Sequence, residues 1–240
     1  MSGVVFDPSP PETLNRLPCV LFHEIGHALV WFASGEAVGT IRLKALGEPS
    51  TWAGSCPAWP RVDGPESLAD PSFWSLRAER ALAGDIAGRK RHGNLPLEVI
   101  SADGLRSSGT LTPDAIISML PDGHDLRKAV ELSRKAVDVK WLDWLNERHR
   151  TALSIVEEYW DEICARAVKI EKGLPKDAIS HRIYGTDVID LFRKAHVPCA
   201  KSPPVEVVYN DDQGPFWVKL RRFVRKFGEN GVLNRYEHCP

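Results

Sequence analysis

Apolar residues recur at helical spacing along most of the chain, and one short segment alternates in the manner of a β-strand. An apolar helix is predicted over 18–33, where Pro18 restarts an earlier helical pattern and Ser34-Gly35 ends it. Alternation of apolar and polar residues predicts a strand over 38–46, with 51–56 as its partner.

The other predicted elements are helices, each marked by an apolar stripe or by a proline near its start. They span roughly 71–88, 112–121, 126–145, 152–163 and 186–195. Stripes of this kind usually indicate packing in a helical core. The fold class that we expect is therefore mainly α with a small β-sheet.

A proline-containing segment at 201–204 has the character of a linker and suggests two regions. We expect one domain over 1–198 and a C-terminal extension over 199–240. Within the extension, 216–227 is basic and amphipathic. Such a segment can lie on a membrane or bind an acidic partner, but docking on its own domain is the commoner meaning of an apolar stripe.

The composition is that of a soluble globular protein, with 43% hydrophobic and 26% charged residues in 240. A net charge of −1 gives no general attraction to nucleic acid or to anionic membranes. The five cysteines are scattered without a C-x-x-C pair, which favours a reducing compartment. With no signal peptide or transmembrane segment in the pattern, we expect a cytoplasmic location.

The helix predicted over 18–33 contains His23-Glu24-Ile25-Gly26-His27. Residues four apart lie on one helix face, so both imidazoles can bind one metal ion, and neutral imidazole suits zinc. Glu24 can then accept a proton from a water whose pKa zinc lowers to about 7. The alternative is a solvated surface helix. It is disfavoured because the flanking residues are apolar, and buried histidines need partners.

A third protein ligand is required, because zinc hydrolase sites take three protein ligands and keep one position open. The extended H-E-x-x-H-x-x-G-x-x-H motif is absent, since position 33 is Ala33. Spacing alone leaves six carboxylate or imidazole candidates open: Glu79, Asp85, Asp103, Asp122, His124 and Asp125.

Five segments of the chain resemble the peptidase domain of the FtsH-type ATP-dependent zinc metalloproteases. Residues 23–28 resemble its H-E-A-G-H-A motif, and 38–46 followed by Gly54 resemble its next two strands. Residues 82–88 resemble L-G-G-R-A-A-E, 125–129 resemble N-D-L-x-x-A-T, and 184–188 resemble L-x-G-x-E-[VIL]. Together these segments cover roughly residues 12–196.

The resemblance implies a zincin-like helical fold with His23, His27 and Asp125 as zinc ligands and Glu24 as general base. His124 is the alternative third ligand, and it stands where the family has Asn. Asp85 replaces the family's Arg and Gly88 its Glu, so the packing around the site is expected to differ. The family's ATPase domain and membrane helices have no counterpart, and no G-x-x-x-x-G-K-[ST] phosphate loop occurs.

The expected activity is that of a stand-alone, ATP-independent zinc metalloendopeptidase acting on unstructured or extended polypeptides. The resemblance also suggests that the strand over 38–46 is an edge strand that pairs with substrate, although it could simply close the sheet. A silent zinc-containing binding module and a zinc amidohydrolase with a non-peptide substrate are the alternatives. A polypeptide substrate is the expected partner, while a separate ATPase and a second copy of the chain stay open.

Overall fold

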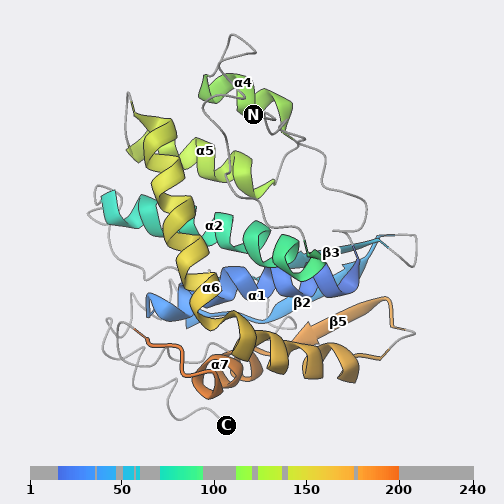
Figure 1. Cartoon of the computed structure of the whole chain (residues 1–240). Helices are drawn as coiled ribbons and strands as arrows, with labels where there is room; N and C mark the ends of the chain where they lie inside the picture. The colour runs from blue at the N-terminus through green and yellow to red at the C-terminus, as the bar shows by residue number, and fades with distance from the viewer. Residues whose placement is uncertain are drawn as a thin grey trace, which may run out of the picture.

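The structure is a computed structural model that describes residues 16–35, 37–46, 51–56, 58–59, 71–93, 112–120, 124–136, 140–175 and 178–199. Helix α1 (Leu17–Ala33) lies at its centre (Figure 1). Pro18 stands in its first turn, and Gly35 follows its end with a φ of 79°, which glycine adopts without strain. The residues of α1 are apolar on nearly every face of the helix, and most of them are buried.

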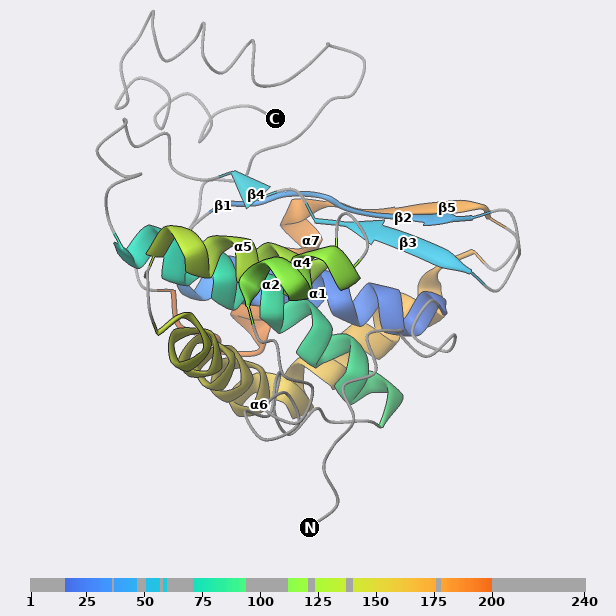
Figure 2. The ribbon, with the colours of Figure 1, turned by 90° about the horizontal axis from the view of Figure 1, so that it is seen from above.

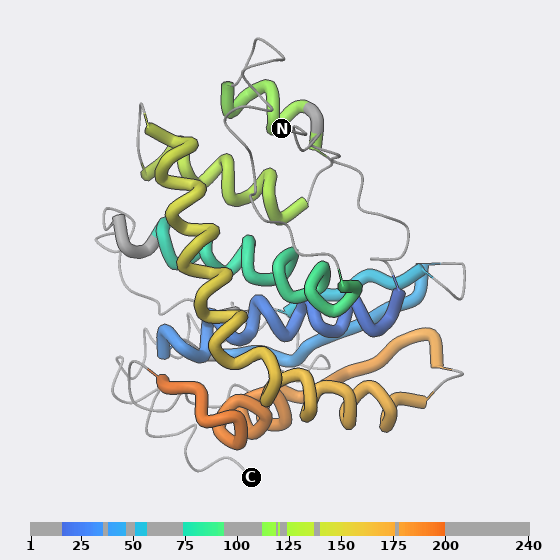
Figure 3. The backbone as a smooth tube through the Cα atoms, in the orientation of Figure 1, coloured from blue at the N-terminus to red at the C-terminus, as the bar shows by residue number. Residues whose placement is uncertain are grey.

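Helix α2 (Pro71–His92) runs beside α1 along most of its length (Figure 3). Glycine at position 26 allows this close approach, because a Cβ there would lie 2.7 Å from the Cβ of Ala87. The helix continues past Gly88, where the sequence pattern predicts its end. Gly88 is a buried residue within the helix that faces α1, not a helix terminator.

The remaining helices are α4 (Pro113–Met119), α5 (Asp125–Ala136), α6 (Trp141–Gly173) and α7 (Gly185–Lys194). The predicted helices over 126–145 and 152–163 are wrong in their boundaries, since 141–145 belong to α6. Neither Gly nor Pro occurs between Ala136 and Trp141, so the local sequence does not indicate that α5 and α6 are separate helices. The other predicted helices match within a few residues.

A three-stranded antiparallel sheet covers one side of the helices (Figure 2). Its order is β3 (Trp52–Ser55), β2 (Ile41–Ala45), β5 (Ser180–Ile183), and Leu43 of β2 stands opposite Gly54 of β3. A separate pair joins β1 (Ala37–Val38) to β4 (Ala58–Trp59). Of the two interpretations left open for the strand within 38–46, a substrate-pairing edge strand is contradicted, because β2 is central in the described sheet. The edge strand that contacts α1 is β3.

The core lies between the sheet and the helices. Its largest fully buried side chains come from α1, β1, β2, α2, α5, α6 and α7, and include Phe22, Trp31, Leu43, Ile86 and Phe192. The chain is thus mainly helical with a small three-stranded antiparallel sheet. Within the described ranges, no helix is both long and apolar enough to cross a membrane. The amphipathic segment 216–227 and almost all of the predicted extension lie outside the described residues.

Candidate metal centre

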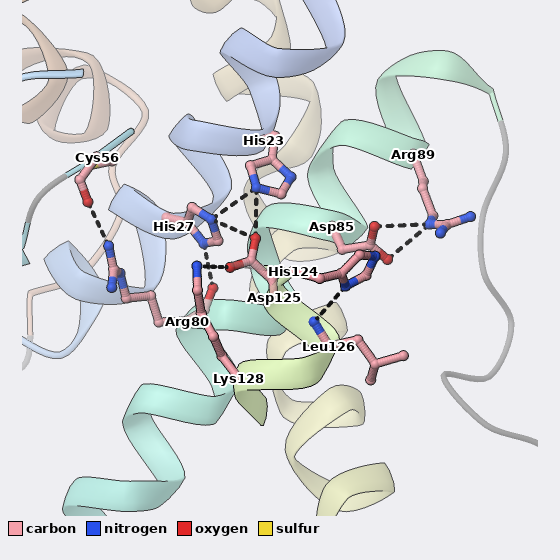
Figure 4. A network of polar contacts seen from close by, with 10 residues as sticks. All are labelled: His23, His27, Cys56, Arg80, Asp85, Arg89, His124, Asp125, Leu126 and Lys128. Carbon is pink, nitrogen blue, oxygen red and sulfur yellow. Dashed lines mark hydrogen bonds and ion pairs between the residues drawn. The ribbon is translucent and has the colours of Figure 1, made fainter. Parts of the chain in front are cut away.

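Three side chains from two helices meet beside the α1–α2 interface (Figure 4). His23 and His27 point from α1, and Asp125 from the first turn of α5. The Asp125 Oδ2 atom lies 2.8 Å from His23 Nε2 and 3.1 Å from His27 Nε2, and the two Nε2 atoms are 3.0 Å apart. The ligand atoms of the three residues all lie within 4.8 Å of one another, so the group could bind a metal ion.

Two further contacts orient these ligand atoms. The Nδ1 atom of His27 donates to the Arg80 backbone carbonyl at 2.7 Å, and this contact turns the Nε2 atom of the ring toward Asp125. The other carboxylate oxygen of Asp125 accepts from Lys128 Nζ at 2.9 Å. Metal-binding histidines and carboxylates are held in the same way, with the atom that does not bind the metal hydrogen-bonded to the protein.

The electrostatics of the group favour a cation among its ligand atoms. Burial disfavours the charged form of His23, but the hydrogen bond and charge of Asp125 outweigh it and raise the pKa of His23 to about 9. Burial likewise opposes ionisation of Asp125. The charge of His27 and the hydrogen bonds from both imidazoles nevertheless hold the Asp125 pKa well below its usual range. Two imidazoles and a carboxylate that face one another fit a divalent metal ion well.

Glu24 follows the first histidine on α1 and is 4% exposed. Its carboxylate packs against strand β3, since a Cβ at Gly54 would lie 2.6 Å from Glu24 Oε1. Glycine at this position therefore gives Glu24 its space beside the metal-ligand group. The charge of Glu24 also acts on His23, and a carboxylate in this position is a candidate general base.

Glycines of α2 give the two histidine rings their space. A Cβ at Gly84 would overlap the ring of His27, and one at Gly88 would lie 3.3 Å from the Cβ of His23. Any larger residue at position 84 must displace the His27 ring. At Gly88 the absence of a side chain lets α2 pack closely on the turn that bears His23.

Of the described candidates for the third ligand, only Asp125 contacts the two histidines, and the others make different contacts. Glu79 is paired with Arg148 at 2.9 Å, and Asp85 is paired with Arg89 at 2.9 Å. The Nδ1 atom of His124 accepts from the backbone N–H of Leu126 at 3.2 Å and so caps the start of α5. Asp103 and Asp122 lie outside the described residues.

Sequence reasoning missed the contribution of Arg80. Its backbone carbonyl orients His27, and its side chain reaches the end of β3. No motif marks this residue, because its role depends on how α2 approaches the sheet. By contrast Gly54 and the 82–88 segment are part of the resemblance, although only the structure shows which side chains they accommodate.

Comparison of the chain with protein-family models and with curated proteins finds no match to either.

Proposed function

We propose that this chain is a zinc metalloendopeptidase related in fold and site to the peptidase domain of the FtsH-type family. The observation that carries the proposal is the convergence of His23, His27 and Asp125, with Glu24 next to His23 on α1 and its charge acting on that histidine. Three protein ligands that include two histidines on one helix are typical of catalytic zinc sites, which keep a further position open. The order of the motif segments along the chain supports the same family.

Bound zinc would supply Lewis acidity and lower the pKa of a water molecule to about 7. Glu24 then takes one proton from the attacking water as the new C–O bond forms at the peptide carbonyl. Glu24 returns this proton to the amine nitrogen as the C–N bond breaks, so the carboxylate ends in its starting state. The packing of Glu24 against Gly54 holds the carboxylate in place for both transfers.

An extended polypeptide is the substrate form that suits this site. Strand β3 is an edge of the described sheet and touches Glu24 at Gly54. The backbone groups of an edge strand can pair with an extended chain, which would bring a peptide bond close to Glu24. A stable folded domain exposes such a segment only when it opens, and that population is small.

The test is digestion of an unfolded substrate, casein, and of a stable folded reporter, each with and without ATP. We expect ATP-independent cleavage of casein and little cleavage of the folded reporter. Glu24→Gln is the matched control, because it changes only the proton acceptor. Cleavage of casein at the parent rate by Glu24→Gln would refute the mechanism. Equal digestion of both substrates would refute the requirement for an extended chain.

A zinc-loaded parent that cleaves neither substrate would contradict the proposed peptidase activity. It would favour the binding-module alternative. Stimulation by ATP in the purified protein would contradict the ATP-independent part of the proposal.

A further inference from the structure

Arg80 connects three elements around the candidate site (Figure 4). Its side chain leaves α2 and donates from Nη2 to the carbonyl of Cys56, directly after β3, at 2.5 Å. The guanidinium carbon lies 5.1 Å from the ring centroid of Trp31 on α1. The Arg80 backbone carbonyl meanwhile accepts from His27. Arg80 thus contacts His27 through its main chain and the end of β3 through its side chain.

This guanidinium has no carboxylate partner among the described residues. Its Nε atom is buried without a hydrogen-bond partner, and burial lowers the pKa of Arg80. The charges of Asp125 and Glu24 favour its charged form. A half-buried guanidinium without a paired carboxylate contributes little to the stability of a fold, so its placement suggests another role.

Strand geometry explains what the Cys56 contact can do. Only Ser55 separates Gly54 of β3 from Cys56, which follows the strand directly. Cys56 itself is buried at 3% exposure, and Gly54 rests on the carboxylate of Glu24. A hydrogen bond that fixes the end of β3 therefore also fixes the distance between the strand and Glu24.

We propose that Arg80 is a positioning residue that clamps the end of β3 and so holds the Glu24 carboxylate in its working orientation. The expected effect of Arg80 on kcat rests on the proposed peptidase function. The clamp itself is a structural claim, and it can be measured without any activity.

Two substitutions separate the roles of the Arg80 side chain. Arg80→Met keeps an apolar stem over Trp31 but removes the donor, whereas Arg80→Lys keeps one charged donor. Arg91→Met is a closely matched control. Arg91 also lies on α2, its guanidinium carbon is also 5.1 Å from a ring centroid of α1, and its Nε is also buried without a partner. It differs because its Nη2 donates to Glu171 of α6 instead of to the strand.

The first measurement is the rate at which N-ethylmaleimide labels Cys56 in the full chain, followed at peptide level by mass spectrometry. Release of the strand end should expose this thiol, and we expect about tenfold faster labelling in Arg80→Met. Arg80→Lys should fall between Arg80→Met and the parent, and Arg91→Met should match the parent. Equal Cys56 labelling in the parent and in Arg80→Met would overturn the proposal.

The second measurement is the kinetics of peptide cleavage at equal zinc content. We expect kcat to fall by about tenfold or more in Arg80→Met, with a much smaller change in KM, because Glu24 acts in the transition state. Arg80→Lys should recover part of kcat. An unchanged kcat despite faster Cys56 labelling would overturn the positioning role. A parent without peptidase activity would refute the proposed function, and the Cys56 labelling rates alone would then decide whether the clamp exists.

Discussion

Two histidine environments among the described residues titrate in opposite directions. His23 and His27 on α1 share the carboxylate of Asp125, and the pKa of His23 is raised to about 9. His149 on α6 is 4% exposed, and its Nε2 atom has no hydrogen-bond partner. Burial lowers its pKa to about 4, although the charge of Asp85 opposes the shift.

The difference follows from the neighbour and not from burial itself. Loss of water disfavours the imidazolium form in both places, but a carboxylate in direct contact reverses the outcome. The α1 pair therefore attracts a proton or a metal ion, while His149 behaves as a neutral core residue. A histidine in an apolar helix is a ligand candidate only when other donor atoms converge on it.

The largest expected effect concerns catalysis beside the α1 pair. Glu24→Gln leaves His23, His27 and Asp125 in place, so we expect full metal content and an unchanged fold. Peptide hydrolysis should fall by about 1,000-fold or more, since the proton acceptor is lost. Steady-state cleavage of a fluorogenic peptide, with metal analysis of the same sample, checks this. A loss of metal in Glu24→Gln would show that the residue is a ligand and not the base.

The second prediction concerns Asp125, the carboxylate that distinguishes the environment of the α1 histidines from that of His149. Asp125→Ala should lower zinc affinity by more than the roughly 100-fold that loss of an outer-shell partner can cause. His124→Ala is the matched control, because its side chain only caps α5, and it should keep near-parent affinity. Competition with a chromogenic chelator measures both. Retained zinc in Asp125→Ala with loss in His124→Ala would reverse the assignment of the third ligand.

The third prediction concerns the packing of Gly84 against the ring of His27. Gly84→Ala places a methyl group in the volume of the His27 ring, and we expect about 1–3 kcal/mol of lost stability together with weaker zinc binding. Gly173→Ala is the control, because a Cβ there meets nothing within 4 Å. Urea unfolding of the two variants gives the comparison. Similar midpoints for both would contradict the close packing of α2 on α1.

The smallest effect concerns His149 and pH. An unfolded histidine titrates near 6.5, whereas folded His149 stays neutral down to about 4. The unfolded state therefore binds the proton first, and stability is lost as pH falls from about 6.5 toward 4. In His149→Phe this part of the acid sensitivity should disappear, by about 1–2 kcal/mol at pH 5. Urea midpoints at pH 7 and pH 5 measure the difference, and equal acid sensitivity in both proteins would refute it.

Local patterns in the sequence predicted the parts of the fold that depend on near neighbours. The apolar run of α1 ends at Ser34-Gly35 as expected, and Thr112 caps α4 through the N–H of Ala115. The β2–β3 pairing was also correct, because alternation and a short connection are both local signals. The prediction of a mainly helical chain with a small sheet is confirmed.

Features that depend on distant contacts could not be predicted in the same way. Strand β5 is only four residues long, and it becomes a strand because β2 offers it an edge. The pairing with β5 makes β2 central, so β2 closes the sheet, which was one of the two interpretations left open for 38–46. The meeting of Asp125 with the histidines depends on how α5 packs against α2, so spacing alone left six candidates and only the resemblance selected one.

The most direct test of the account is the position of zinc in a crystal of the full chain, located by its anomalous scattering. We predict one peak about 2.0–2.2 Å from His23 Nε2, His27 Nε2 and an oxygen of Asp125, with Glu24 close by but not bound. Zinc located elsewhere, or held by His124 in place of Asp125, would contradict the central claim.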